Sequence, residues 1–125
     1  MSGPIVVKIG GSTLGAEDTS LEDLVALQQA GRPPIAVHGG GALTTDWLAR
    51  LGIESEFVDG LRSTNEEALR VVIAVLRGVV NTELVASIGA LGGRAAGLCG
   101  VDGVTIRAER YDERLGFVGR ITGVD

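Results

Sequence analysis

The chain has very few of the residues that disulfide-linked, thiol-dependent or aromatic-rich proteins use. Its 125 residues include one cysteine, one histidine and only 3% aromatic residues. The lone Cys99 cannot form an internal disulfide, and its apolar neighbours predict a small buried side chain. A catalytic thiol would need a partner base, but the only histidine, His38, lies in a different predicted loop. With so few aromatic residues, the core must consist of Val, Leu, Ile and Ala, as in a parallel sheet covered by helices.

Basic residues and long apolar runs are also scarce. The net charge is −5, and the eleven Lys and Arg residues are scattered along the chain. Nucleic-acid binding requires clustered positive charge, so we expect no nucleic-acid partner. No uninterrupted apolar run reaches the roughly 18 residues of a membrane span, and no signal-peptide pattern opens the chain. The expectation is a cytoplasmic, single-domain protein with no membrane partner.

Glycine, in contrast, is abundant, and its placement is informative. The chain has twenty glycines, about twice the average share of roughly 7%. Three of them, Gly39–Gly41, follow the apolar run 34–37 and His38, and a predicted helix over 42–51 comes next. Backbone N–H groups at such a helix start can bind a phosphate or a carboxylate. An ordinary strand-to-helix turn is the alternative.

A second glycine segment follows the apolar strand predicted over 5–9. This strand contains Lys8 and ends in Gly10 and Gly11. A lysine beside glycines can reach a phosphate, although it could instead cap an exposed strand end. The order of residues differs from the P-loop, in which the lysine follows the glycines, and neither segment has the G-x-G-x-x-G spacing of a dinucleotide site.

The order of these elements predicts how the chain folds. A helix starting near Ser20 separates the two strands, so they should be parallel and joined by a right-handed crossover. Both glycine segments would then lie at the carboxyl edge of one sheet and converge on one ligand. The predicted class is α/β, a three-layer sandwich with a mainly parallel central sheet flanked by helices.

The remaining chain contains one candidate side chain and one unusual helix. Arg62 follows a short strand or hairpin predicted over 52–61, with Asp59-Gly60 as its turn. It could clamp a carboxylate or pair with a surface Glu. The helix predicted over Asn65–Leu91 is apolar on more than one face, which favours a homodimer interface or burial under a further domain. We further predict a buried strand over 95–99 and, near the C-terminus, a β-hairpin of 104–107 with 117–121.

Several of these segments together resemble the amino acid kinase family, and within it the acetylglutamate kinase branch. The resemblance covers nearly the whole chain, but only the first half of the family's pattern. It therefore implies a single domain over residues 1–125, similar to the N-terminal lobe that binds the acyl amino acid, without the ATP-binding lobe. The segments are Val7-Lys8-Ile9-Gly10-Gly11, Val37-His38-Gly39-Gly40-Gly41, Phe57-Val58-Asp59-Gly60-Leu61-Arg62, Gly78-Val79-Val80-Asn81 and Gly97-Leu98-Cys99-Gly100-Val101-Asp102-Gly103.

The resemblance implies an activity in arginine biosynthesis. ATP with Mg²⁺ would phosphorylate the side-chain carboxylate of N-acetyl-L-glutamate, which gives an acyl phosphate. Lys8 matches the catalytic lysine that neutralises the transferred phosphoryl group, and Arg62 matches the arginine that grips the α-carboxylate. A carboxylate is already a nucleophile at neutral pH, so positioning and charge stabilisation suffice and no catalytic His or Cys is expected.

The glycines receive roles from the same resemblance. Gly10, Gly11, Gly39 and Gly40 match the backbone donors around the phosphoryl group. Gly40 and Gly41 also match the positions at the reacting end of the substrate. No residue of this chain matches a metal ligand.

Two alternatives stay open beside this interpretation. One is another small-acid kinase of the family, of the aminoadipate, aspartate or uridylate type, because Ser63 and Asn65 stand where relatives commonly have apolar and acidic residues. The other is a non-catalytic binding or dimerisation module. Since the second half of the family's pattern is missing, we expect the chain alone to be inactive as a kinase.

Overall fold

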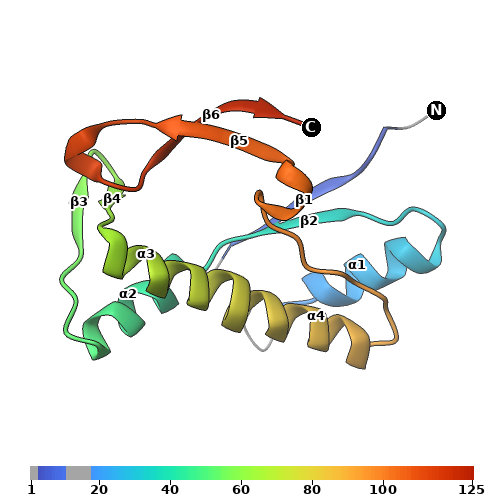
Figure 1. The fold of residues 1–125 in the computed structure, drawn as a ribbon. Coiled ribbons are helices and arrows are strands. Elements are labelled where there is room, and N and C mark those ends of the chain that lie inside the picture. The colour runs from blue at the N-terminus through green and yellow to red at the C-terminus, as the bar shows by residue number, and fades with distance from the viewer. Residues whose placement is uncertain (1–2, 11–17) are drawn as a thin grey trace.

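Two parallel strands joined by a helix carry the two glycine segments, in a computed structural model that describes residues 3–10 and 18–125 (Figure 1). Strand β1 (Val6–Ile9) leads through α1 (Ser20–Gln29) to β2 (Ile35–His38). The strands pair in parallel, with Ile9 opposite His38. Both glycine segments therefore begin at the same edge of this pair, as predicted.

A long helix forms the base of the molecule. After β2, helix α2 (Gly41–Arg50) follows at once, and further along the chain α3 (Glu66–Ile73), the π-helical segment η1 (Ala74–Val80) and α4 (Asn81–Ala90) run without a break. We call Glu66–Ala90 the long helix. The Asn65 side chain caps it by accepting a hydrogen bond of 2.8 Å from the Ala68 N–H. This cap explains why the helix begins where the sequence predicts.

The core lies between α2 and the long helix. Leu48 of α2 and Val75 of the long helix are fully buried. Small and branched aliphatic side chains surround them, as the scarcity of aromatic residues requires. The other buried members of this core are Ala68, Val71, Val80 and Leu84, with Leu21, Leu43 and Ile53 packed against them.

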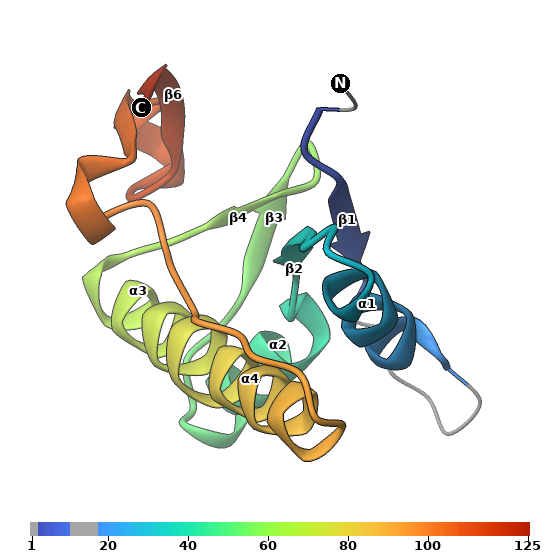
Figure 2. The same cartoon turned by 90° about the vertical axis from the view of Figure 1, so that its right-hand side faces the viewer.

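The α-helices and η1 of the described residues lie on one side of the β1–β2 pair, and the C-terminal hairpin lies on the other side (Figures 1 and 2). The α/β class, the parallel pair, the flanking helices and the C-terminal hairpin are confirmed. In the described part of the chain, the parallel sheet consists of β1 and β2 alone. Its face away from the helices exposes Val6, Ile35 and Val37.

Two antiparallel hairpins complete the fold. The first joins β3 (Glu56–Val58) to β4 (Leu61–Ser63) through the predicted Asp59-Gly60 turn, in which both residues have positive φ. The second joins β5 (Ile106–Arg110) to β6 (Gly119–Val124). It begins later than predicted, because residues 102–104 form a short 3₁₀ turn.

The buried strand predicted over 95–99 is wrong. This segment forms no strand and runs back along the long helix, with residues 95–98 exposed (Figure 2). The Cys99 N–H donates to the Asp102 side chain at 2.8 Å, and Arg94, just before the segment, bonds a side chain of α1. Gln28 accepts from the Arg94 N–H at 2.7 Å and donates to the Arg94 carbonyl at 2.6 Å. Cys99 is half-buried rather than buried, and its Sγ accepts a hydrogen bond from Arg77.

The long helix is also apolar enough, by length and composition, to cross a membrane. Its most apolar 18-residue window has a mean hydropathy of 1.8, and 17% of that window is buried. Length and composition are weak grounds for a membrane span, because core helices of soluble proteins meet the same criteria. Here Val75 and Leu84 of this helix belong to the core against α2.

The close approach of Gly40 to the long helix yields a stability prediction. Gly40 has φ of 154°, and a Cβ there would lie 2.7 Å from Leu76 Cδ2 and 3.1 Å from Val80 Cγ2. Backbone strain and overpacking should make Gly40→Ala less stable by about 1–3 kcal/mol. Chemical denaturation measures this free energy of unfolding. Gly39→Ala is the matched control, because its Cβ would meet nothing within 4 Å; equal losses in both variants would contradict the packing argument.

Candidate functional site

Backbone N–H groups line the loop that connects β2 to α2. We call Gly39–Gly41 the glycine loop. Gly40 is the N-cap of α2 and supplies no capping side chain. Its carbonyl accepts hydrogen bonds of 2.9 Å from both the N–H and the hydroxyl of Thr44. The N–H groups of Gly40 and Gly41 find no partner among the described residues, so they can receive an anion at the positive end of the helix dipole.

The two glycine segments do come together. The Gly39 N–H donates to the Ile9 carbonyl at 3.3 Å, and Gly10 lines the same pocket as Gly39 and Gly40. The predicted convergence at one edge of the sheet is therefore present for these three glycines. Gly11 lies outside the described residues, so its predicted position has no counterpart here.

Lys8 lies on the opposite face of β1 from the buried Ile9. It is exposed and stands in register with Val37 of β2. No ion pair within residues 3–10 and 18–125 involves Lys8. Its ammonium group is therefore not neutralised by a carboxylate of the described chain.

Arg62 reaches the glycine loop from the first hairpin. Its guanidinium donates to the Gly41 carbonyl at 3.5 Å and to the Thr45 hydroxyl at 2.6 Å, and Ser55 accepts a further bond. The group also stacks on the Phe57 ring, 4.6 Å from its centre. Arg62 is therefore held beside the first turn of α2 rather than paired with a surface Glu. Three of its five N–H donors are used, which leaves two for a ligand.

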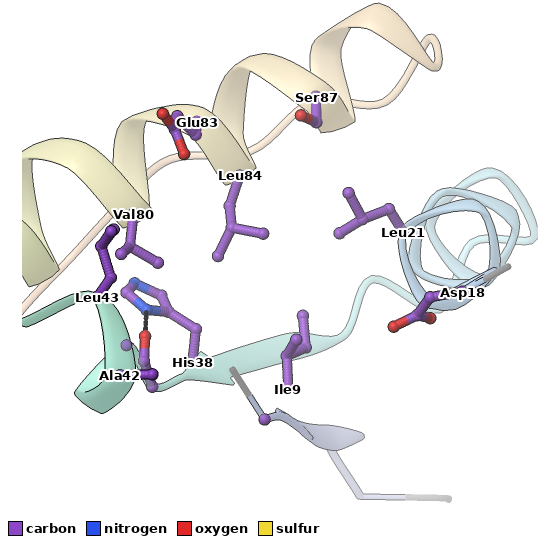
Figure 3. A pocket seen from close by; sticks show the side chains of 13 residues that line it. Ile9, Asp18, Leu21, His38, Ala42, Leu43, Val80, Glu83, Leu84 and Ser87 are labelled. Carbon is purple, nitrogen blue, oxygen red and sulfur yellow. Dashed lines mark hydrogen bonds between the residues drawn. The ribbon is translucent and has the colours of Figure 1, made fainter. Parts of the chain in front are cut away.

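A pocket of about 380 Å³ backs the glycine loop on the side of the helices (Figure 3). Its lining includes Ile9, Gly10, Gly39 and Gly40, together with Asp18 and with Glu83 and Ser87 of α4. Hydrogen bonds from Ser20 hold the pKa of Asp18 below its ordinary value.

His38 connects the glycine loop to the long helix. Its Nδ1 lies 2.9 Å from the Gly39 carbonyl oxygen, and its Nε2 lies 3.0 Å from Nδ2 of Asn81. Since Ile9 and His38 are opposite each other in the register, both side chains point toward the helices. This placement agrees with a structural role for His38 rather than one as an acid or base.

Sequence reasoning did not find the residues that hold Arg62 and His38. Thr45, Ser55 and Phe57 are separated from Arg62 in sequence, and only the folded hairpin brings them to it. Asn81 gives no signal of its own, because a polar residue within an apolar helix has many possible roles. The Asp59-Gly60 turn, which places Phe57 opposite Arg62 across the hairpin, is the one signal that was present.

The described residues do not form a metal site. Within residues 3–10 and 18–125 no three His, Cys, Asp or Glu side chains are grouped so that they could hold an ion.

Comparisons with known proteins find sequence relatives among the acetylglutamate kinases. Curated relatives include the acetylglutamate kinase of Dehalococcoides mccartyi, 46% identical over 97% of this chain, and that of Thermosynechococcus vestitus, 47% identical over 96%. The alignments cover 44% and 42% of those relatives. The chain therefore spans less than half the length of the curated relatives it matches.

Solved structures show the same fold. The crystal structure of smu.665 from Streptococcus mutans matches 97% of this chain and 50% of that one, with a TM-score of 0.87 and 25% identity. The N-acetylglutamate synthase of Neisseria gonorrhoeae, solved with coenzyme A and L-arginine, matches 98% of this chain and 31% of that one, with a TM-score of 0.59 and 19% identity. The sequence profile of the amino acid kinase family matches residues 3–125, and the chain belongs to that family.

Proposed function

We propose that this chain is the acceptor-binding portion of an acetylglutamate kinase. In the complete enzyme, ATP would phosphorylate the side-chain carboxylate of N-acetyl-L-glutamate at the glycine loop. The observation that carries the proposal is the position of Arg62, whose guanidinium lies beside the glycine loop through its contacts with Gly41 and Thr45. An acid with two carboxylates fits a site with an arginine at one end and backbone N–H groups at the other.

The glycine segments would surround the reacting groups. The unpartnered N–H groups of Gly40 and Gly41 support a role at the reacting carboxylate, and Gly10, Gly39 and Gly40 are close enough together to flank a phosphoryl group. Gly11 belongs to the proposal by resemblance alone. Backbone donors that are already oriented stabilise developing charge without reorganising during the reaction.

Lys8 would neutralise charge on the transferred phosphoryl group. The absence of an ion pair to Lys8 within the described residues supports this role, because its ammonium group remains available to an anion. No general base is required, since the acceptor carboxylate is ionised at neutral pH. The nucleotide, with its Mg²⁺, would be bound mostly by the part of the enzyme that this chain does not span.

A titration of the chain with N-acetyl-L-glutamate, followed by MgATP, tests this proposal. Calorimetry should detect binding of the acid without the nucleotide. Arg62→Ala should weaken that binding by about 1.5–3 kcal/mol, the value of hydrogen bonds to a charged group. Arg62→Lys should recover part of the loss, because it keeps the charge but not the planar fork.

The matched control is Arg120→Ala, which removes an arginine that pairs with Glu109 on the C-terminal hairpin. Its affinity for the acid should equal that of the wild type. Absence of binding by the wild-type chain would contradict the acceptor role and favour a non-catalytic module. Binding that Arg62→Ala leaves unchanged would remove Arg62 from the site. Stronger binding of aspartate or an aminoadipate derivative would indicate another small-acid kinase.

We also infer that the long helix forms a homodimer interface with a second copy of the chain. Ile73 is 52% exposed, and helical geometry places it opposite the buried Val71 and Val75. The chain should therefore run as a dimer in size-exclusion chromatography with light scattering, and Ile73→Glu should shift it toward the monomer. Val124→Glu is the control, because Val124 is 71% exposed but lies on β6. A monomeric wild type would contradict the interface.

A cytoplasmic location remains part of the proposal.

A further inference from the structure

We propose that Asn81 is a positioning residue for the glycine loop. Acting through His38, it fixes the direction of the Gly39–Gly40 peptide and so aims the Gly40 N–H at the anion. The inference rests on the proposed function, because the anion is the group on which that N–H would act. It assigns a task to two polar side chains that the proposed chemistry otherwise leaves unused.

The hydrogen-bond partners decide where the proton of His38 lies. The Gly39 carbonyl can only accept, so Nδ1, 2.9 Å away, must carry the proton. In the neutral ring Nε2 then has a lone pair, and the Asn81 amide nitrogen at 3.0 Å donates to it. Asn81 thus selects the tautomer that His38 needs in order to hold the Gly39 carbonyl.

Holding that carbonyl also orients the next N–H group. A trans peptide is planar, and its C=O and N–H point in opposite directions. When His38 holds the Gly39 carbonyl on the helix side of the loop, the Gly40 N–H must point the other way. Gly40 needs such a restraint, because its φ of 154° is a conformation that glycine can also leave easily.

Two glycines leave the space that the Asn81 amide and the glycine loop occupy. A Cβ on Gly97 would lie 1.7 Å from the Asn81 Oδ1, so only glycine makes room for the amide. A Cβ on Gly40 would meet Leu76 and Val80, which lie within the turn that precedes Asn81. These side chains belong to η1, and π-helical segments are often found at functional sites. Residues 38–40, 81 and 97, distant in sequence, thus meet at one point.

The test uses the fact that His38 is the chain's only histidine. Its ring ¹⁵N signals are therefore unambiguous, and the neutral ring of the wild type should show a protonated Nδ1 and an unprotonated Nε2. Asn81→Ala should shift the ring toward the Nε2-protonated tautomer and move the Gly40 amide resonance. The control Thr82→Ala removes the exposed neighbour of Asn81 and should change neither signal.

Conservative variants separate positioning from simple packing. Asparagine at position 38 can place a donor near Nδ1, whereas glutamine places its amide near Nε2. His38→Asn should therefore keep the wild-type affinity for N-acetyl-L-glutamate, while His38→Gln and Asn81→Ala lose roughly fivefold, the value of about one hydrogen bond.

The outcomes distinguish this inference from the proposed function. An Nε2-protonated wild-type ring, or an Asn81→Ala variant with an unchanged tautomer and Gly40 resonance, would overturn the positioning role even if the acid binds. Equal affinity losses in His38→Asn and His38→Gln would also overturn it. A wild-type chain that does not bind the acid would refute the proposed function, and the ring and Gly40 signals would still decide the inference.

Discussion

The packing of α2 against the long helix depends on one close contact, in which the backbone of Gly40 lies directly against that helix. A side chain at this position would overlap Leu76 and Val80. Since Gly40 has no Cβ, the β2–α2 connection can approach the long helix closely. This close approach allows α2 to bury Leu48 in the same core as Val75. Gly40 is also the N-cap of α2, so this contact lies beside the N–H groups that we propose as the anion site.

The sequence predicted the parts of the fold that depend on local patterns. Glycine after an apolar run, an Asn at a helix start and a period near 3.6 were enough to predict β1, β2, α2 and the long helix, as well as the edge where the glycines meet. The strand predicted over 95–99 was wrong, since its apolar run forms no strand pairing in the described chain. Whether such a run pairs depends on tertiary partners, which local patterns do not contain.

For the candidate site, the sequence predicted which residues take part but not the hydrogen-bond partners that position them. Arg62 was predicted as a candidate for binding a carboxylate, but its bonds to Thr45 and Ser55 arise only when a hairpin folds onto α2. The link from Asn81 to His38 joins positions 43 residues apart. Such long-range polar contacts leave no periodicity in the sequence, so pattern reasoning could not find them.

Exposed apolar surface agrees with a chain that spans less than half of its relatives. Val6, Ile35 and Val37 cover the face of the parallel pair that no described helix packs on, and Leu98 is 76% exposed on the segment beside the long helix. This surface, together with the glycine loop at the edge of the same pair, agrees with the proposal that the chain is the acceptor-binding portion of a kinase.

The central claim is that the glycine loop and Arg62 together receive the acid. Mapping backbone and side-chain resonances of the ¹⁵N-labelled chain during a titration with N-acetyl-L-glutamate tests it most directly. The account predicts that the largest changes occur at the Gly40 and Gly41 amides and at the Arg62 guanidinium. Changes confined to Glu83 and Ser87 of the pocket, or to the exposed face of β1 and β2, would contradict it.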